Sequence, residues 1–318
     1  MPRLMPTIHA VHTTPTPLGK DRHDRTCWAR GALAATVLAL ATLGAAPAWA
    51  DKAAVHYNLG LQLKREGKVT EAIAEVENAI AARPSYAAAH LTLGNLWRTQ
   101  GNYDKAAAAY EKAAGLEPKD AVARGNLGSA YVRLKRIDEG IRELEESVAL
   151  APNEYEVRTS LGFAYRQKGD YKKAIVHLTK ATELRPQETS AWTNLGVARS
   201  KADDKEGAIV AFKKALTINP ADGDLHFNLA TVYRRQRDTD LAISEYETAV
   251  KYNPRLAKAY YDLGILYSQE RRIPEAAAAL RKYLEVGTDE DAPSRKDAEE
   301  RLKILNPPGS AAAKSGKK

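Results

Sequence analysis

Proline recurs every 34 residues through most of this 318-residue chain, and no other feature constrains its fold as strongly. The six positions are Pro84, Pro118, Pro152, Pro186, Pro220 and Pro254. A Leu-Gly pair, first seen at Leu59-Gly60, keeps the same period in every copy except the sixth, which has Leu229-Ala230. A fixed period of roughly 20 to 50 residues is the signature of one supersecondary unit stacked many times. The period therefore predicts one elongated array of seven copies.

Each copy is expected to form two helices of about 12 to 14 residues joined by a short turn. The turn position has glycine in three copies and another residue in four: Gly67, Gly101, Gly169, Lys135, Asp203, Arg237 and Arg271. A left-handed helix end suits glycine, so modest backbone strain is expected at the other four. Because no copy can bury its apolar stripe alone, neighbouring copies must stack.

The second copy, counted from Ala87, shows the full set of recurring residues at positions 4, 7, 8, 11, 20, 24, 27 and 32. They are His90, Leu93, Gly94, Trp97, Ala106, Tyr110, Ala113 and Pro118. This pattern resembles the tetratricopeptide-repeat (TPR) family, and the resemblance covers residues 51 to about 288. It implies an all-α fold, a right-handed superhelical solenoid of seven helix-turn-helix repeats. The repeats are 51–84, 85–118, 119–152, 153–186, 187–220, 221–254 and 255–288.

Residues 1–50 have the order of a signal peptide. A basic stretch is followed by an uncharged apolar run from Gly31 to Ala46, and then by Ala48-Trp49-Ala50. This is the n-region, h-region and A-x-A order of an export signal. The apolar run is shorter than the roughly 20 residues that a membrane-spanning helix prefers. We therefore predict cleavage after Ala50 and a periplasmic or secreted protein, with an uncleaved N-terminal membrane anchor as the alternative.

The C-terminal end of an open solenoid exposes an apolar stripe, so a cap is expected there. Residues 289–308 are predicted to hold a capping helix, with Leu302 and Leu305 on its apolar face. Residues 309–318 are small, polar and basic, which predicts a disordered tail.

The chain contains none of the common catalytic or nucleotide-binding motifs, such as a Gly-rich phosphate loop or a His-Glu-x-x-His pair. Its single cysteine, Cys27, lies in the predicted signal. His56, His90 and His226 share position 4 of their copies, which is typical of a core-filling slot and not of a metal or catalytic site. Without residues 1–50 the chain has 43 basic and 38 acidic residues, a small excess for a nucleic-acid binder. We predict no enzyme activity, no cofactor, no metal, no small-molecule substrate and no nucleic-acid partner.

Positions 2, 5, 6, 9, 12 and 13 of the first helix in each copy lie opposite the core positions, because each residue turns the helix by about 100°. We call this side the first-helix face. The resemblance implies that it lines a concave groove and contacts peptides. Position 6 has a short hydrogen-bonding side chain in every copy: Asn58, Thr92, Asn126, Ser160, Asn194, Asn228 and Asp262. An asparagine amide can donate to and accept from a peptide backbone. The series is either a ladder that holds an extended peptide or a set of bonds between neighbouring repeats.

Positions 12 and 13 concentrate positive charge: Lys64, Arg65, Arg98, Arg133, Arg166, Lys201, Arg234 and Arg235. A concave positive surface attracts acidic partners, although charged side chains are also common on ordinary solvated helix faces. Positions 5 and 9 add apolar residues, which mark binding surfaces when they are exposed.

The predicted peptide-binding residues are Asn58, Asn126, Asn194, Asn228, Lys64, Arg98, Arg133, Arg166, Arg234, Tyr57, Phe163 and Phe227. The sequence thus favours a non-catalytic scaffold that binds an extended, acidic peptide or protein in its groove, with no membrane span once the signal is removed. The alternative is a structural or assembly component of an envelope secretion or polysaccharide-export machine. Such a component would use convex or terminal surfaces.

Overall fold

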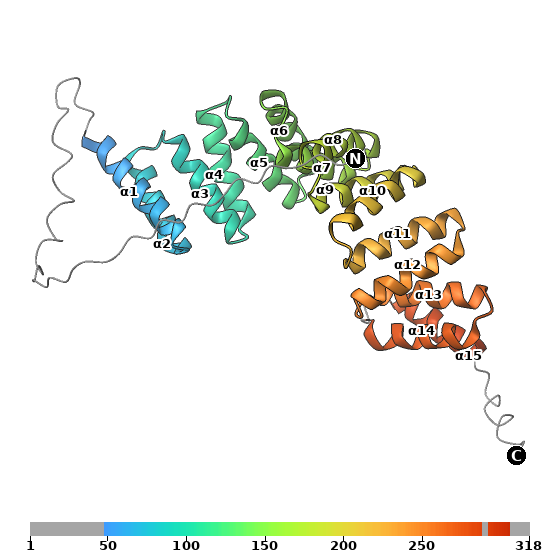
Figure 1. Ribbon diagram of the computed structural model, residues 1–318. Helices are drawn as coiled ribbons and strands as arrows, with labels where there is room; N and C mark the ends of the chain where they lie inside the picture. Colours follow the sequence, from blue (N-terminus) through green and yellow to red (C-terminus); the bar gives the residue numbers. More distant parts are fainter. Residues whose placement is uncertain (1–47, 288–291, 306–318) are drawn as a thin grey trace, which may run out of the picture. The chain divides into compact units, whose positions relative to one another are not determined.

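The computed structural model describes residues 48–287 and 292–305, and these residues form 15 α-helices and no strand (Figure 1). The predicted signal peptide and tail therefore lie almost entirely outside the described residues. The first helices of the seven copies are α1 (Ala48–Arg65), α3 (Ala87–Thr99), α5 (Ala121–Arg133), α7 (Tyr155–Lys168), α9 (Thr189–Lys201), α11 (Gly223–Gln236) and α13 (Ala257–Gln269). The second helices are α2 (Val69–Ala82), α4 (Tyr103–Leu116), α6 (Ile137–Leu150), α8 (Tyr171–Leu184), α10 (Lys205–Ile218), α12 (Thr239–Tyr252) and α14 (Ile273–Val286). The last helix is α15 (Ala292–Leu305).

Each first helix packs against the second helix of its own copy, and each second helix packs against the first helix of the next copy. Helices more than one copy apart make no extensive contacts within the described residues. The predicted all-α solenoid of helix pairs with a C-terminal capping helix is therefore confirmed. In such a solenoid, stability comes from each pair and from its interfaces with the neighbouring pairs.

Glycine at position 8 allows the two helices of a copy to approach closely. A Cβ atom built at Gly94 would lie 2.4 Å from Cε1 of Tyr110, which fills position 24 on the paired helix and is fully buried. A Cβ atom at Gly196 would lie 2.7 Å from Cε1 of Phe212 in the same way. Because this glycine has no side chain, it leaves room for a large buried side chain on the paired helix.

The turn between the helices of a copy has a left-handed residue in all seven copies. Gly67, Gly101 and Gly169 have φ angles of 77°, 75° and 85°. The other four copies place a residue with a Cβ atom there, at φ angles from 58° to 64°: Lys135, Asp203, Arg237 and Arg271. The left-handed conformation predicted for these four turns is confirmed, and it carries a steric cost for a residue with a Cβ atom.

Position 4 forms a structural hydrogen bond in the second to sixth copies, and the sequence interpretation missed it. The side chains of His90, Arg124, Arg158, Trp192 and His226 bond the backbone carbonyl of the periodic proline six residues earlier, at distances of 2.7–3.0 Å. A helix end leaves carbonyl groups without a helical partner, and these ring or guanidinium nitrogens supply one. His90 and His226 are therefore bonded residues at the repeat junction, while His56 of the first copy lies 2.7 Å from Glu75 on its paired helix, which corrects the prediction of these histidines as simple core fillers.

Tyrosines at position 11 link consecutive copies. The hydroxyl of Tyr131 donates to Glu111 of the preceding copy at 2.5 Å, and Tyr165 donates to Glu145 in the equivalent place. Burial and the Glu111 carboxylate raise the pKa of Tyr131 to about 12. Some acidic residues of the second helices are thus bonded across a repeat interface.

The capping helix α15 covers the end of the last copy. Ala298 of α15 is fully buried against Leu280 and Tyr283 of α14, and Leu302 and Leu305 pack around them as predicted. No described helix is long and apolar enough to cross a membrane.

Candidate functional site

Two hollows open on the first-helix face. The first has a volume of about 520 Å³ and is bounded by α3, α5, α7 and α9 with the start of α4. The second has a volume of about 440 Å³ and is bounded by α9, α11 and α13 with one residue of α10. Nearly all their lining residues occupy the positions that the helical geometry assigned to this face. Seven of the twelve predicted binding residues line one hollow or the other: Arg98, Arg133, Phe163, Asn194, Phe227, Asn228 and Arg234.

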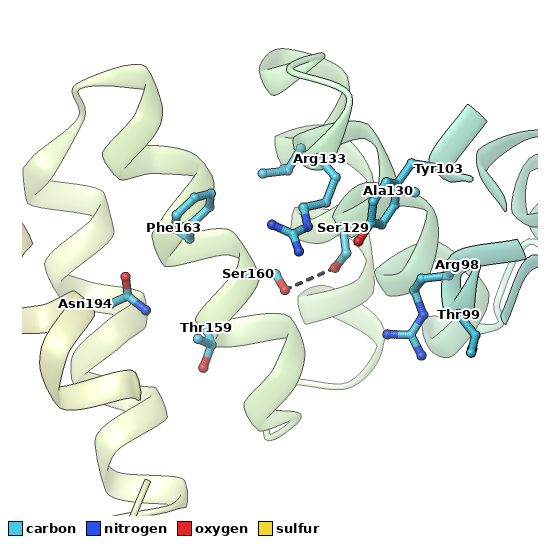
Figure 2. Close-up of a pocket in the computed structure, with 11 residues that line it drawn as sticks. Arg98, Thr99, Tyr103, Ser129, Ala130, Arg133, Thr159, Ser160, Phe163 and Asn194 are labelled. Atoms are coloured by element: carbon cyan, nitrogen blue, oxygen red, sulfur yellow. Dashed lines mark hydrogen bonds between the residues drawn. The ribbon is translucent and has the colours of Figure 1, made fainter. Parts of the chain in front are cut away.

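The first hollow has arginines on one side and hydroxyl, amide and aromatic groups on the other. Figure 2 shows the guanidinium group of Arg133 directed toward α7, which carries Phe163 and Thr159, while Arg98 lies on the α3 side of the hollow. Neither arginine forms an ion pair with a carboxylate of the described chain. The guanidinium of Arg133 lies 5.4 Å from the ring centre of Tyr103, which orients it by a cation–π contact.

Arg166 stands next to the first hollow on α7. Its guanidinium lies 4.8 Å from the ring centre of Phe163, a residue that lines the hollow. Its Nε atom is buried and has no hydrogen-bond partner among the described residues. Burial lowers the pKa of this guanidinium below its ordinary value. The hydroxyl of Thr159, also in the lining, is buried and unpartnered in the same sense.

The second hollow has basic residues as well, but its arginines are bonded within the chain. Arg234 donates to the carboxylate of Asp262 at 2.9 Å, and the Asp262 side chain is 12% exposed. Arg235 donates to the backbone carbonyl of Ser200 at 2.6 Å and to Asp203 at 3.0 Å. Burial raises the pKa of Asp262, while the adjacent Arg234 opposes that rise. The charges of these two arginines are therefore neutralised by contacts between neighbouring copies, whereas Lys201 and Lys258 of the lining form no ion pair within the described residues.

The position-6 residues do not form one uniform ladder. The amide of Asn126 lies 3.5 Å from Oδ1 of Asn95, in the preceding copy, which is the bond between repeats that the sequence left open. The amide of Asn194 donates to the backbone carbonyl of Ser190 in its own helix at 2.9 Å. Asn228 lines the second hollow with no hydrogen bond recorded among the described residues. The amide oxygen of Asn194 and both groups of Asn228 therefore remain open to a ligand.

The two ends of the first-helix face are occupied by bonds within the chain. Tyr57, predicted as a binding residue, shares a hydrogen bond with Thr92 at 3.1 Å and its ring contacts Tyr86. At the other end, Tyr261 donates to Asp297 of the capping helix at 2.7 Å. Asn58 and Lys64 of α1 are exposed and lie outside both hollows.

Sequence reasoning did not single out several residues of the first hollow. Ser129 donates to Ser160 across the α5–α7 boundary at 3.1 Å, as drawn in Figure 2. Thr159 lies at position 5, so its place on the face could have been inferred, but its unpartnered hydroxyl could not. Tyr103 begins a second helix and belongs to no first-helix position, so the pattern gave no signal for it.

No group of three or more His, Cys, Asp or Glu side chains in residues 48–287 and 292–305 is arranged to hold a metal ion. The lining of both hollows also lacks a nucleophile paired with a general base, the arrangement that covalent catalysis requires. The polar groups of the face instead suit hydrogen bonding and charge recognition.

The chain matches tetratricopeptide-repeat families along nearly all of its helical array. The matched residues are 57–121 and 227–294 for one such family, and 98–161, 162–202 and 189–222 for three others. The chain belongs to the tetratricopeptide-repeat family. Proteins of this family are generally scaffolds for protein interactions and are typically non-catalytic. No curated protein sequence matches the chain significantly.

Several solved structures share the fold. A tetratricopeptide repeat protein from Parabacteroides merdae is 18% identical, with a TM-score of 0.57 over 80% of this chain and 99% of that one. YrrB, a TPR protein with an unusual peptide-binding site, is 21% identical, with a TM-score of 0.53 over 58% of this chain and 95% of that one. A MamA structure is 29% identical, with a TM-score of 0.50 over 53% of this chain and 97% of that one.

Proposed function

We propose that this protein is an envelope scaffold that holds an extended peptide or protein segment along its first-helix face. The observation that carries the proposal is the pair of hollows, which open on the face that the family resemblance implies contacts peptides. Their linings combine hydrogen-bonding, aromatic and basic side chains, and such a mixture suits a peptide that offers backbone amides and mixed side chains. The presence of a peptide-binding site in YrrB is consistent with this use of the fold.

The proposed partner is acidic. Basic residues line both hollows, and no acidic residue lines the first. A cleft lined by one sign of charge raises the local concentration of oppositely charged ligands and speeds their association. The proposed location outside the cytoplasm rests on the signal-like order of residues 1–50.

The test is affinity capture from envelope extracts with the purified protein as bait, followed by mass spectrometry of the captured proteins. A bait with Phe163→Ala and Phe227→Ala serves as the comparison, because these changes remove one aromatic contact from each hollow. Partners captured equally by both baits would argue against binding in the hollows.

A second function is supported by the exposed N-terminal end of the array. Val55 and Leu59 of α1 are 64% and 41% exposed, whereas Leu127 and Leu161, at the position equivalent to Leu59, are buried. A structural component of an envelope machine would use such a terminal surface. Val55→Asp with Leu59→Asp would then remove partners that the phenylalanine changes leave in place.

A further inference from the structure

Two arginines line the first hollow and a third stands beside it, and their positive charges are not neutralised within the described residues. Arg98, Arg133 and Arg166 stand in three consecutive copies, and no described carboxylate pairs with them. Elsewhere on the same face, arginines reach acids of the adjacent copy, as Arg234 and Arg235 do. The arginines at the first hollow therefore lack the acidic partners that Arg234 and Arg235 find in neighbouring copies.

Aromatic rings hold two of these guanidinium groups in place. Arg133 lies over Tyr103 and Arg166 lies over Phe163. A guanidinium stacked on a ring keeps its N–H groups in the guanidinium plane free for an acceptor. Because less side-chain freedom is lost on binding, such a preorganised donor binds an anion more tightly than a mobile lysine would.

Two buried donors near this hollow have no acceptor in the described chain, namely Nε of Arg166 and the hydroxyl of Thr159. A buried polar group without a partner is costly, so proteins seldom keep one without a reason. Both donors belong to α7, where Thr159 lines the hollow and Arg166 lies beside Phe163 of the lining. They favour a small anionic acceptor that enters from the hollow.

We propose that the first hollow binds the side-chain carboxylate of an internal Asp or Glu residue of the peptide partner. Arg98 and Arg133 supply the charge, Thr159 supplies a hydroxyl donor, and Phe163 contacts an apolar residue adjacent to the acid. The inference rests on the proposed function and adds a residue-level specificity to it. Guanidinium groups match a planar carboxylate with two parallel hydrogen bonds, which gives direction as well as charge.

The acid is internal to the peptide because the first-helix face continues on both sides of the hollow. Asn126 and Asn95 lie toward α3, while Val197 leads into the second hollow. A chain can therefore pass along the face and place one side chain in the first hollow. A terminal carboxylate would need no such continuation.

The experiment starts with selection of a random peptide library, displayed on phage, against the purified protein. Selected peptides are synthesised with blocked termini, and titration calorimetry compares each with its Glu→Gln or Asp→Asn form. We expect the acid form to bind at least about tenfold more tightly, because charge-assisted hydrogen bonds are lost in the amide form. Arg133→Gln should reduce this ratio to within about threefold, on the same reasoning.

Arg65→Gln is the matched control. Arg65 occupies the same repeat position as Arg133 and its loss changes the net charge equally, but it is exposed on α1 and lies outside both hollows. The control variant should keep the wild-type ratio. Circular dichroism of both variants shows whether the fold is retained.

Equal binding of acid and amide peptides, or equal effects of the two arginine changes, overturns the carboxylate site while leaving peptide binding intact. Tighter binding of phosphoserine than glutamate at the same place overturns it in favour of a phosphate site. A dependence on a free peptide C-terminus overturns the internal placement. Failure to select any peptide counts against the proposed function itself, and the inference falls with it.

Discussion

The two hollows lie on the same face and use the same repeat positions, yet they differ in how their arginines are satisfied. In the second hollow Arg234 and Arg235 donate to Asp262 and Asp203, which come from neighbouring copies. In the first hollow Arg133 has an aromatic ring beside it and no carboxylate within the described chain. The difference indicates that a repeat position alone does not define a binding residue. Whether an arginine at that position can bind a ligand depends on whether the adjacent copy places an acidic or hydroxyl side chain within bonding distance of it.

The largest expected effect is a loss of stability in the helices that carry the first hollow, with a smaller loss in those that carry the second. Leu127 is buried in the cluster beneath the first hollow, and the second hollow rests on a separate cluster that includes Leu225 and Leu229. Leu127→Asp should cost roughly 3 kcal/mol or more, because an ionised carboxylate would be buried without a partner. Since a solenoid is stabilised by nearest neighbours, hydrogen exchange should show opening around α5 before opening around α11.

Leu116→Asp is the control for this change, because Leu116 is 40% exposed. A surface substitution normally changes stability by less than about 0.5 kcal/mol. If thermal melting shows equal losses for the two variants, the assigned core of the third copy is wrong.

The next effect concerns the ion pair of the second hollow. Arg234→Gln leaves the buried carboxylate of Asp262 without its cationic partner, and we expect a loss of about 1–3 kcal/mol at pH 7. Burial already raises the pKa of Asp262, and Arg234 opposes that rise, so the variant should raise this pKa further. A carboxyl with a raised folded-state pKa contributes stability at low pH that is lost as pH rises through that pKa. Denaturant unfolding should therefore show a smaller loss at pH 4 than at pH 7.

Arg133→Gln provides the comparison in the first hollow. It leaves no described carboxylate unpaired, so its effect on stability should be small at both pH values. A pH-dependent loss in this variant would mean that the first hollow has a hidden acidic partner.

The asparagines of the two hollows should contribute to binding to different extents. Asn194 uses its amide N–H within its own helix, whereas Asn228 has both its amide N–H and its carbonyl open. Asn228→Ala should weaken a bound peptide by roughly two- to tenfold, and Asn194→Ala by less, at about 0.5–1.5 kcal/mol per lost hydrogen bond. Titration calorimetry with a selected peptide measures both. The reverse order would show that the peptide backbone bonds mainly at the first hollow.

The smallest expected effect makes the second hollow more like the first. Asp262→Asn introduces the amide found at this position in other copies and removes the ion pair with Arg234, whose guanidinium can then bind a ligand. An acidic peptide should then bind about threefold more tightly, mainly through faster association that weakens at high salt. Stopped-flow association at two salt concentrations tests this. No change in the association rate would mean that the second hollow does not contact the acidic part of the peptide.

Much of the fold could be predicted because the repeat imposes the same requirement many times. The position of Pro84 and its equivalents depends on local chain geometry, which involves residues close in sequence. The contact between Gly94 and Tyr110 joins two helices of one copy, so it also repeats with the chain. The capping helix could be predicted because an uncovered apolar stripe must be buried. The bonds of position 4 could not, since they join a side chain to a backbone carbonyl at the repeat junction.

The site was predicted less completely. The helical angle between positions was enough to place Phe163, Phe227 and Arg133 on one face. It could not show that Tyr57 already bonds Thr92, because that contact joins residues 35 positions apart. The geometry of a single helix determines which residues lie on the first-helix face. Whether such a side chain is available to a ligand depends on the contacts it makes with the neighbouring copy.

The sequence by itself determined the repeat period, the two helices of each copy, the stacking and the positions that form the first-helix face. These follow from backbone sterics and from the burial of apolar stripes, which act locally and repeat with the chain. Only the tertiary structure decided that Arg234 is neutralised by Asp262 while Arg133 and Arg166 are not. Electrostatic and hydrogen-bond partners act over a few ångströms of space, and side chains that are 28 residues apart in the chain become neighbours only when the copies stack.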